Sequence, residues 1–209
     1  MLELHNIVLF IAASLTLNIT PGPDMMYVIT RSVSEGRGAG IASAFGIAGG
    51  TIIHTLAVAF GLSGLLLAVP SAYVVIKLVG AAYLVYLGIK TLFKKPINNE
   101  TGSFQKKSTF AVFYQGVFTN VFNPKVALFF LAFLPQFIDS SGGNVALQII
   151  MLGLLFNTTG TLVNLIVALS ASKLGKKLKT KLQNSNIFKW ITASVLIGLG
   201  IRIALMERK

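Results

Sequence analysis

The sequence predicts an all-α membrane protein with six transmembrane helices, arranged as two inverted three-helix repeats with a broken first helix in each half. Three observations lead to this fold class. Of the 209 residues, 54% are hydrophobic and only 11% are charged, whereas about 25% of the residues in soluble domains are charged. Long apolar stretches recur along the chain, and proline interrupts the first and the fourth of them. Since a membrane helix takes about 20 residues, six helices leave room for short loops and for no soluble domain.

The apolar stretches divide the chain into two halves. Residues 1–6 contain Glu3 and His5 but no Lys or Arg, so we expect the first stretch to be a retained helix rather than a signal peptide. A polar, lysine-containing linker at about 94–109 separates repeat 1, at about 1–93, from repeat 2, at about 110–209. We expect them to form a single transmembrane domain over residues 1–209. The six predicted spans are 7–29, 39–69, 72–93, 110–137, 145–172 and 187–206.

The basic residues predict the orientation of these spans. The net charge is +12, from 18 Lys plus Arg against 6 Asp plus Glu. Basic residues occur in the first, third and fifth predicted loops, and none occurs in the second and fourth, at 67–71 and 138–144. Because positive charge marks the cytoplasmic side, we expect both termini to lie outside. The charge therefore reflects topology and attraction to membrane lipid, and it does not indicate a nucleic-acid partner.

Matching residues in the two halves indicate an internal duplication. A single shift of the chain superposes Pro21 on Pro124, Gly50 on Gly153 and His54 on Asn157. Because three spans reverse the direction of the chain, the second copy is inverted, as in transporters that hold their site near the membrane midplane. The alternative is that each half uses glycine independently for close helix packing.

The first span is interrupted by the segment Asn18-Ile19-Thr20-Pro21-Gly22-Pro23-Asp24. Proline lacks an amide donor, so backbone carbonyls are freed here, and such a break persists at membrane depth only inside protein or beside a wet cavity. An intramembrane carboxylate needs a partner in the bundle, which makes Asp24 the leading candidate. The alternative is that Asp24 caps the helix that resumes at Met25. The candidate site residues of this segment are Asn18, Thr20, Pro21, Gly22, Pro23 and Asp24.

The fourth span has a corresponding interruption, Asn120-Val121-Phe122-Asn123-Pro124-Lys125. Lys125 is near the middle of its span, too deep for its amine to reach water easily, so we expect it to pair with Asp24. The alternative is a purely structural ion pair that joins the two halves. The candidates here are Asn120, Asn123, Pro124 and Lys125.

Polar residues of the second and fifth spans complete the candidate site, namely His54, Asn157 and Asn164. His54 is near mid-span and suits a proton relay, or else it is a hydrogen-bonded packing histidine. With no cysteine and one His and one Asp at mid-membrane, a metal site is poorly supported and we expect no cofactor. No spacing fits a catalytic triad, so we expect no enzyme.

Four segments of the chain resemble the LysE/RhtB family of bacterial amino-acid exporters: NITPGPDMMYVITRS, GRGAGIASAFGIAGGTIIHTLAVAFGL, LVGAAYLVYLGIKTL and NVFNPKVALFFLAFLPQF. The likeness runs from Leu15 to the end of the chain. The family's first motif, Asn-x-x-Pro-Gly-Pro, is matched by Asn18, Pro21, Gly22 and Pro23, with Asp24 following, and its second motif is matched by Asn123, Pro124 and Lys125. The resemblance implies an inner-membrane exporter of neutral amino acids or close derivatives, driven by the proton gradient, and it allows a homodimer.

The residues themselves are compatible with this class. An amino-acid zwitterion carries an ammonium group, which suits Asp24 and freed carbonyls, and a carboxylate, which suits Lys125 and a half-helix N-terminus. Protonation of Asp24 offers a means of coupling export to protons. Two alternatives remain open. One is a divalent-cation or other small-solute exporter of the same architecture, and the other is a non-transporting membrane scaffold.

Overall fold

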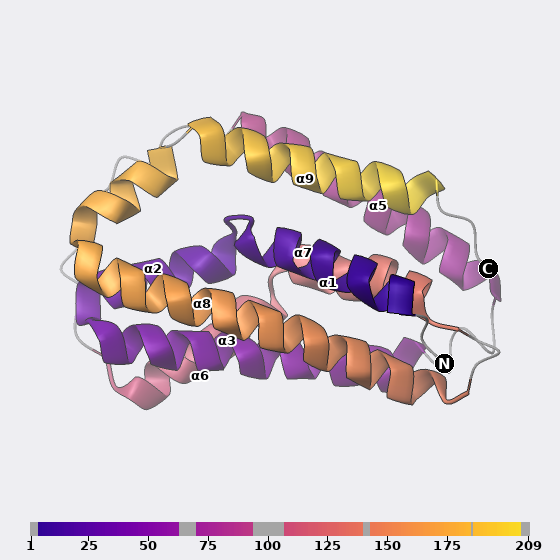
Figure 1. Ribbon diagram of the computed structural model, residues 1–209, viewed down its shortest axis with the longest axis horizontal. Helices are drawn as coiled ribbons and strands as arrows, with labels where there is room; N and C mark the ends of the chain where they lie inside the picture. Colours follow the sequence, from indigo (N-terminus) through magenta and orange to yellow (C-terminus); the bar gives the residue numbers. More distant parts are fainter. Residues whose placement is uncertain (1–3, 63–69, 94–106, 140–142, 185, 206–209) are drawn as a thin grey trace.

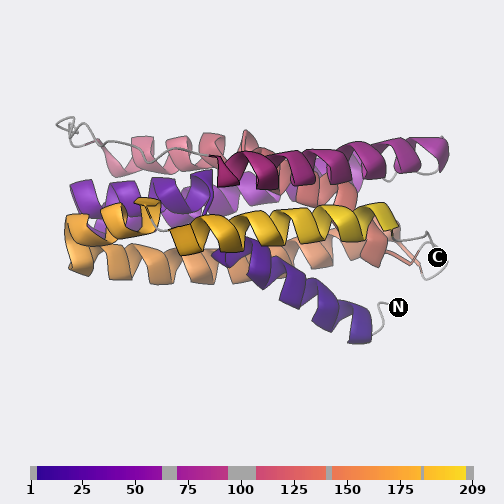
Figure 2. The ribbon, with the colours of Figure 1, turned by 90° about the horizontal axis from the view of Figure 1, so that it is seen from above.

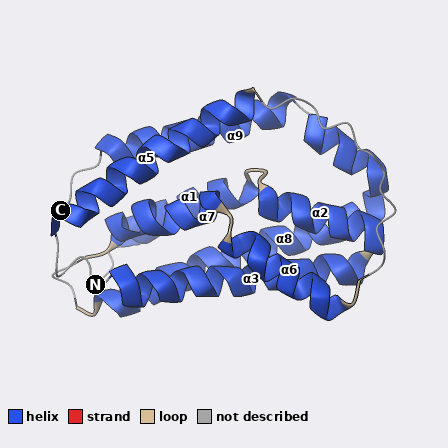
Figure 3. Cartoon of the chain, turned by 180° about the vertical axis from the view of Figure 1, so that it is seen from behind, coloured by secondary structure: helices blue, strands red, loops and turns tan. Residues whose placement is uncertain are grey.

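The computed structural model describes residues 4–62, 70–93, 107–139, 143–184 and 186–205. Helices account for nearly all of these residues, and none of them belongs to a strand (Figure 3). The elements in chain order are α1 (Leu4–Ile19), α2 (Pro23–Glu35), α3 (Arg37–Ala57), the π-helical turn η1 (Val58–Leu62), α5 (Pro70–Leu92), α6 (Thr109–Val121), α7 (Pro124–Leu128), the π-helical turn η2 (Phe129–Phe133), the 3₁₀ turn η3 (Leu134–Phe137), α8 (Val145–Asn184) and α9 (Asn186–Leu205).

The helices pack into an elongated bundle. Along one side α5 and α9 lie next to each other, and along the other side α3 packs against both α6 and α8 (Figures 1 and 2). The segments α1, α2 and α7 lie between these two groups in Figure 1. The beginning of α1 and the end of α9 lie at the same end of the bundle.

Two continuous helices are long and apolar enough to cross a membrane, Arg37–Gly61 and Val145–Lys173. Two bent pairs pass the same test of length and composition: Asn6–Ile19 with Pro23–Glu35, bent by 50°, and Thr109–Val121 with Pro124–Phe137, bent by 47°. The described part of the chain therefore contains two to four candidate spans. The helices α5 and α9 coincide with the predicted third and sixth spans but are not among these four, and the inverted six-span arrangement stays a prediction.

Proline accounts for both bends. The chain is extended at Gly22 (φ −153°, ψ −173°), and α2 begins at Pro23. In the second bent pair α7 begins at Pro124, and the Oδ1 atom of Asn123 caps it by accepting a hydrogen bond from the amide of Lys125 at 3.1 Å. Proline is favoured in the first turn because its missing N–H is not needed there. Both interruptions lie where the sequence predicted them.

Two helices continue beyond the predicted spans. The helix α2 continues past residue 29, the end of the first predicted span, to Glu35, so Arg31 lies in a helix and is only 7% exposed. The helix α8 continues past residue 172 to Asn184, through the lysine-rich segment predicted as the fifth loop. Lysine is a good helix former, so a helix need not stop where its apolar stretch ends. Residues 94–106 of the predicted linker lie outside the described residues, and α6 begins at Thr109, within that linker.

Glycine brings α3 and α6 into contact. A Cβ atom on Gly50 would lie 2.7 Å from the Cβ of Asn120 and 2.8 Å from the carbonyl oxygen of Val117, and one on Gly46 would overlap the carbonyl oxygen of Phe113. Such close backbone approach is typical of helix contacts in membranes. It places the side chain of Asn120 directly against α3.

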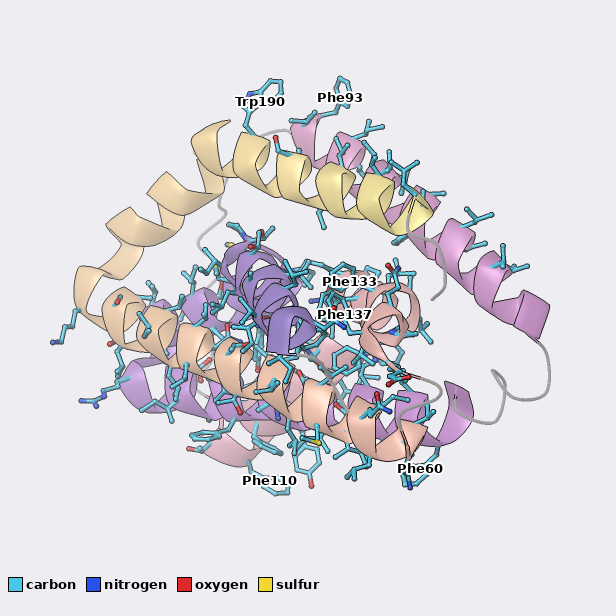
Figure 4. The ribbon with its side chains drawn as sticks, turned by 45° about the vertical axis from the view of Figure 1, so that its right-hand side comes forward. Phe60, Phe93, Phe110, Phe133, Phe137 and Trp190 are labelled. Carbon is cyan, nitrogen blue, oxygen red and sulfur yellow. The ribbon has the colours of Figure 1, made fainter. Side chains whose placement is uncertain are left out.

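Aromatic side chains mark the inside and the outside of the bundle. Phe133 and Phe137 pack into the core, whereas Phe60, Phe110 and Trp190 point away from it (Figure 4). Phe60 is 73% exposed and Phe110 is 70% exposed. Large apolar groups on the outside of a helical bundle fit a surface in contact with lipid rather than water.

Candidate functional site

A small cavity lies where the two broken helices meet. Its volume is about 20 Å³, which is room for one or two water molecules and not for an amino acid. Most of its wall is formed by side chains of α1, α2, α3, α6 and α8. The predicted candidates that line it are Asn18, Asp24, Asn120, Lys125, Asn157 and Asn164.

Lys125 is bound to the end of the first helix. Its Nζ atom donates hydrogen bonds to the carbonyl oxygens of Leu17, at 3.0 Å, and Thr20, at 2.9 Å. Pro21 has no amide hydrogen to offer Leu17, whose oxygen accepts instead from the Thr20 amide, at 3.2 Å, and from Nζ. The side chain is only 8% exposed, so the ammonium is held inside the protein by backbone oxygens.

The predicted ion pair between Asp24 and Lys125 is not formed in this conformation. No oxygen of Asp24 lies within 4.0 Å of the Lys125 ammonium, although both side chains are described and line the same cavity. The physical reason is competition, because the freed carbonyl oxygens of Leu17 and Thr20 already accept from Nζ. The two segments are near neighbours, as predicted. The two charged side chains line the same cavity but do not contact each other directly.

Asp24 binds Asn120 across the cavity. Its Oδ2 atom accepts a hydrogen bond from the Nδ2 atom of Asn120 at 2.8 Å, while Oδ1 is buried and has no hydrogen-bond partner. The alternative role as a helix cap is not what the structure shows. Gly22 occupies the cap position, and Asp24 lies within the first turn of α2, where a negative charge is favourable.

Asn120 connects Asp24 to the second span. Its Oδ1 atom accepts a hydrogen bond from Thr51 at 3.4 Å, and its carbonyl oxygen lies 3.2 Å from Nε2 of His54. A carbonyl oxygen can only accept, so this contact requires the proton of His54 to be on Nε2. The His54 ring also stacks on Phe130, with centroids 5.8 Å apart. His54 therefore touches the site through the backbone of Asn120 rather than lining the cavity.

The fifth-span candidates face the cavity from α8. Asn157 accepts a hydrogen bond from Thr161 at 3.4 Å, and Asn164 is buried. Asn18 of α1 reaches the same helix, because its Nδ2 atom donates to Thr159 at 3.1 Å. These amides thus contribute neutral polar groups to the wall of the same cavity.

The remaining candidates shape the breaks. The hydroxyl of Thr20 donates to the carbonyl oxygen of Thr16 at 2.7 Å, within its own helix. Asn123 caps α7 with its oxygen, while its buried Nδ2 atom has no hydrogen-bond partner. The other members of the set, Pro21, Gly22, Pro23 and Pro124, contribute backbone geometry.

A second polar cluster, which we call the α2–α6 clamp, was not predicted from the sequence. Arg31 forms an ion pair with Glu35 and donates a hydrogen bond to Gln115 of α6. Its guanidinium lies over the ring of Tyr27, at 5.5 Å, and the Tyr27 hydroxyl donates to the carbonyl oxygen of Val112 at 2.7 Å. The clamp thus comprises Tyr27, Arg31, Glu35 and Gln115. Opposite charges four residues apart on a helix were the available signal.

The described residues bring no three His, Asp or Glu side chains together as a metal site would require. Instead, two broken helices meet at a small cavity, with one carboxylate and one ammonium among the described side chains of its wall. In an all-helical membrane protein, this arrangement is that of a transporter of small solutes.

The chain belongs to the LysE family: the family profile described as LysE type translocator matches residues 15–207. Members of this family are transporters rather than enzymes. A membrane protein of Bacillus subtilis, YrhP, is 30% identical over 97% of this chain and its own full length. A leucine efflux protein of Salmonella choleraesuis is 24% identical over 95% of this chain and 94% of its own length. No solved structure matches the chain.

Proposed function

We propose that this protein exports neutral amino acids or close derivatives across the bacterial inner membrane, driven by the proton gradient. The observation that carries the proposal is the presence of a buried carboxylate, on Asp24, and a buried ammonium, on Lys125, on the wall of one cavity. An amino-acid zwitterion carries the two complementary charges. The amides of Asn157 and Asn164 add neutral hydrogen-bonding groups. The leucine efflux relative supports a small neutral substrate.

Transport requires the cavity to open, since about 20 Å³ does not hold an amino acid. The predicted topology places the end of α2 on the cytoplasmic side. The α2–α6 clamp then closes the cytoplasmic route, because Arg31, Glu35 and Gln115 join the two helices there. An exporter loads its substrate from this side. We therefore infer that the clamp opens before loading and closes before release.

Asp24 is the proposed proton carrier. It is 8% exposed, and one of its oxygens has no hydrogen-bond partner. Protonation of this carboxylate removes a charge from the cavity and changes its affinity for a zwitterion. Asn120 connects Asp24 to His54, which is the second candidate for a proton-carrying group.

Counterflow in proteoliposomes tests the proposal. Vesicles containing purified protein and loaded with one unlabelled amino acid should accumulate the labelled form of a substrate, and an imposed pH gradient should drive net export of that substrate. Asp24→Asn is the matched variant without a titratable carboxylate. Stabilisation and flux of a divalent cation instead would support the cation exporter, and absence of all flux across the amino-acid and cation panels would support the scaffold.

A further inference from the structure

The break between α1 and α2 forms a binding site for a primary ammonium group. Two backbone oxygens, on Leu17 and Thr20, accept hydrogen bonds from the same nitrogen, at 3.0 and 2.9 Å. The carboxylate of Asp24 lies on the same cavity wall, beyond direct contact with this nitrogen. A primary ammonium has three N–H donors. The ammonium of a lysine side chain and that of an amino acid can therefore each donate to both backbone oxygens.

Gly22 makes room for the present occupant. A Cβ atom at this position would lie 3.1 Å from Nζ of Lys125 and 3.3 Å from its Cε atom. Since Gly22 is in the extended conformation, its backbone does not demand glycine. The space beside the lysine is the feature that glycine supplies.

We infer that Lys125 is a tethered ammonium that occupies the substrate-ammonium site in the closed state, and that a substrate binds by displacing it. The exchange leaves the carbonyl oxygens of Leu17 and Thr20 paired throughout, because one ammonium replaces another. The displaced Lys125 is then free to bind the substrate carboxylate. The part of this inference that concerns substrate rests on the proposed function, whereas the ammonium site itself does not.

Such an exchange explains how the site would select zwitterions. A simple amine offers an ammonium but no carboxylate to receive Lys125, and a carboxylic acid cannot replace Lys125 at the carbonyl oxygens. Either molecule would leave a buried charge without a partner, which is strongly unfavourable. Only a molecule with both groups completes the exchange.

Chemical rescue tests the ammonium site without any transport measurement. Lys125→Ala removes a propylammonium group, so n-propylammonium should fill the vacated space and restore the hydrogen bonds to Leu17 and Thr20. We expect the melting temperature of this variant in detergent to rise by roughly 3 to 5 °C for each tenfold increase in n-propylammonium above its Kd. If the variant aggregates on extraction, purification with n-propylammonium should yield folded, monodisperse protein.

Matched controls isolate the hydrogen bonds. N,N,N-Trimethylpropylammonium has the charge but no N–H, and propan-1-ol has the chain but no charge, so neither should stabilise Lys125→Ala. The wild type and Lys173→Ala, which changes an exposed lysine, should not respond to n-propylammonium because Lys125 still holds the site. Lys125→Met should not respond, since its side chain fills the space.

The proposal is overturned if n-propylammonium neither raises the melting temperature of Lys125→Ala nor rescues its folding, or if the trimethyl compound does so equally well. These results are distinguishable from failure of the proposed function. Rescue without amino-acid counterflow in the wild type would support the site and contradict the exporter, whereas counterflow without rescue would do the reverse.

Discussion

Alanine substitutions along α3 test whether its close contact with α6 positions Asn120 for Asp24. At Gly50 the added Cβ would lie 2.7 Å from the Cβ of Asn120 and 2.8 Å from its Oδ1 atom. Overpacking of this kind costs about 1 to 3 kcal/mol. Displacement of Asn120 would also weaken its hydrogen bond to Asp24, and hydrogen bonds to charged groups contribute about 1.5 to 3 kcal/mol. We therefore expect Gly50→Ala to lower both stability and proton-driven export.

Two other glycines of α3 provide controls on the same helix. A Cβ on Gly49 would lie 3.3 Å from a methyl group of Val117, a much smaller overlap than at Gly50, so we expect Gly49→Ala to change the stability little. A Cβ on Gly38 would meet nothing within 4 Å, and Gly38→Ala should stabilise the helix by up to about 1 kcal/mol. The expected order of stability is therefore Gly38→Ala, then Gly49→Ala, then Gly50→Ala.

Thermal unfolding in detergent measures the stability, and efflux from vesicles with an imposed pH gradient measures the function. The comparison of Gly49→Ala with Gly50→Ala is decisive because the two positions are adjacent and the added group is the same. If Gly50→Ala matched Gly49→Ala in both measurements, the contact with Asn120 would not be what positions Asp24, and the reasoning would be refuted.

Three further predictions concern charge, gating and orientation. Asp24→Asn should fold normally and lose proton-driven efflux, whereas Lys125→Ala should lose about 3 to 5 kcal/mol of stability because it strands buried partners. Asp24→Asn combined with Lys125→Gln should regain folding without regaining efflux. Normal efflux in that double variant would show that a group other than Asp24 carries the proton. Glu35→Gln should weaken the α2–α6 clamp and raise the reactivity of a cysteine placed in the cavity toward a reagent added from the cytoplasmic side, and unchanged reactivity would contradict a gate there. In intact spheroplasts an impermeant reagent should label a cysteine at Asn144 and not one at Lys107, and the opposite pattern would reverse the topology.

The sequence was informative where a single residue dictates backbone geometry. Pro23 and Pro124 each begin a new helix, so both interruptions were predictable from proline chemistry alone. The proximity of Asp24 and Lys125 was also predictable, because both are charged and deep in apolar sequence. Their hydrogen-bond partners were not. Which acceptor Lys125 binds depends on where the carbonyl oxygens at the end of α1 lie relative to α7, and local sequence does not encode that distance.

The α2–α6 clamp was missed for a related reason. Arg31 follows the predicted end of an apolar stretch, where a basic residue usually indicates a cytoplasmic loop. In the structure Glu35 neutralises it one turn later, so the helix continues and the pair is buried. A run of apolar residues predicts a helix where its surface is apolar. It does not predict the part of a helix in which paired charges replace apolar side chains.

The pairing of α5 with α9 has a consequence for how the protein is assembled. A Cβ on Gly88 of α5 would lie 2.9 Å from the carbonyl oxygen of Ala193, and one on Gly200 of α9 would lie 2.7 Å from that of Ala81. These surfaces fit each other closely, but α9 is synthesised long after α5. The glycine face of α5 must therefore remain without this partner while the whole second half of the chain leaves the ribosome. A chain that lacks α9 should consequently leave the glycine face of α5 uncovered and prone to misassembly.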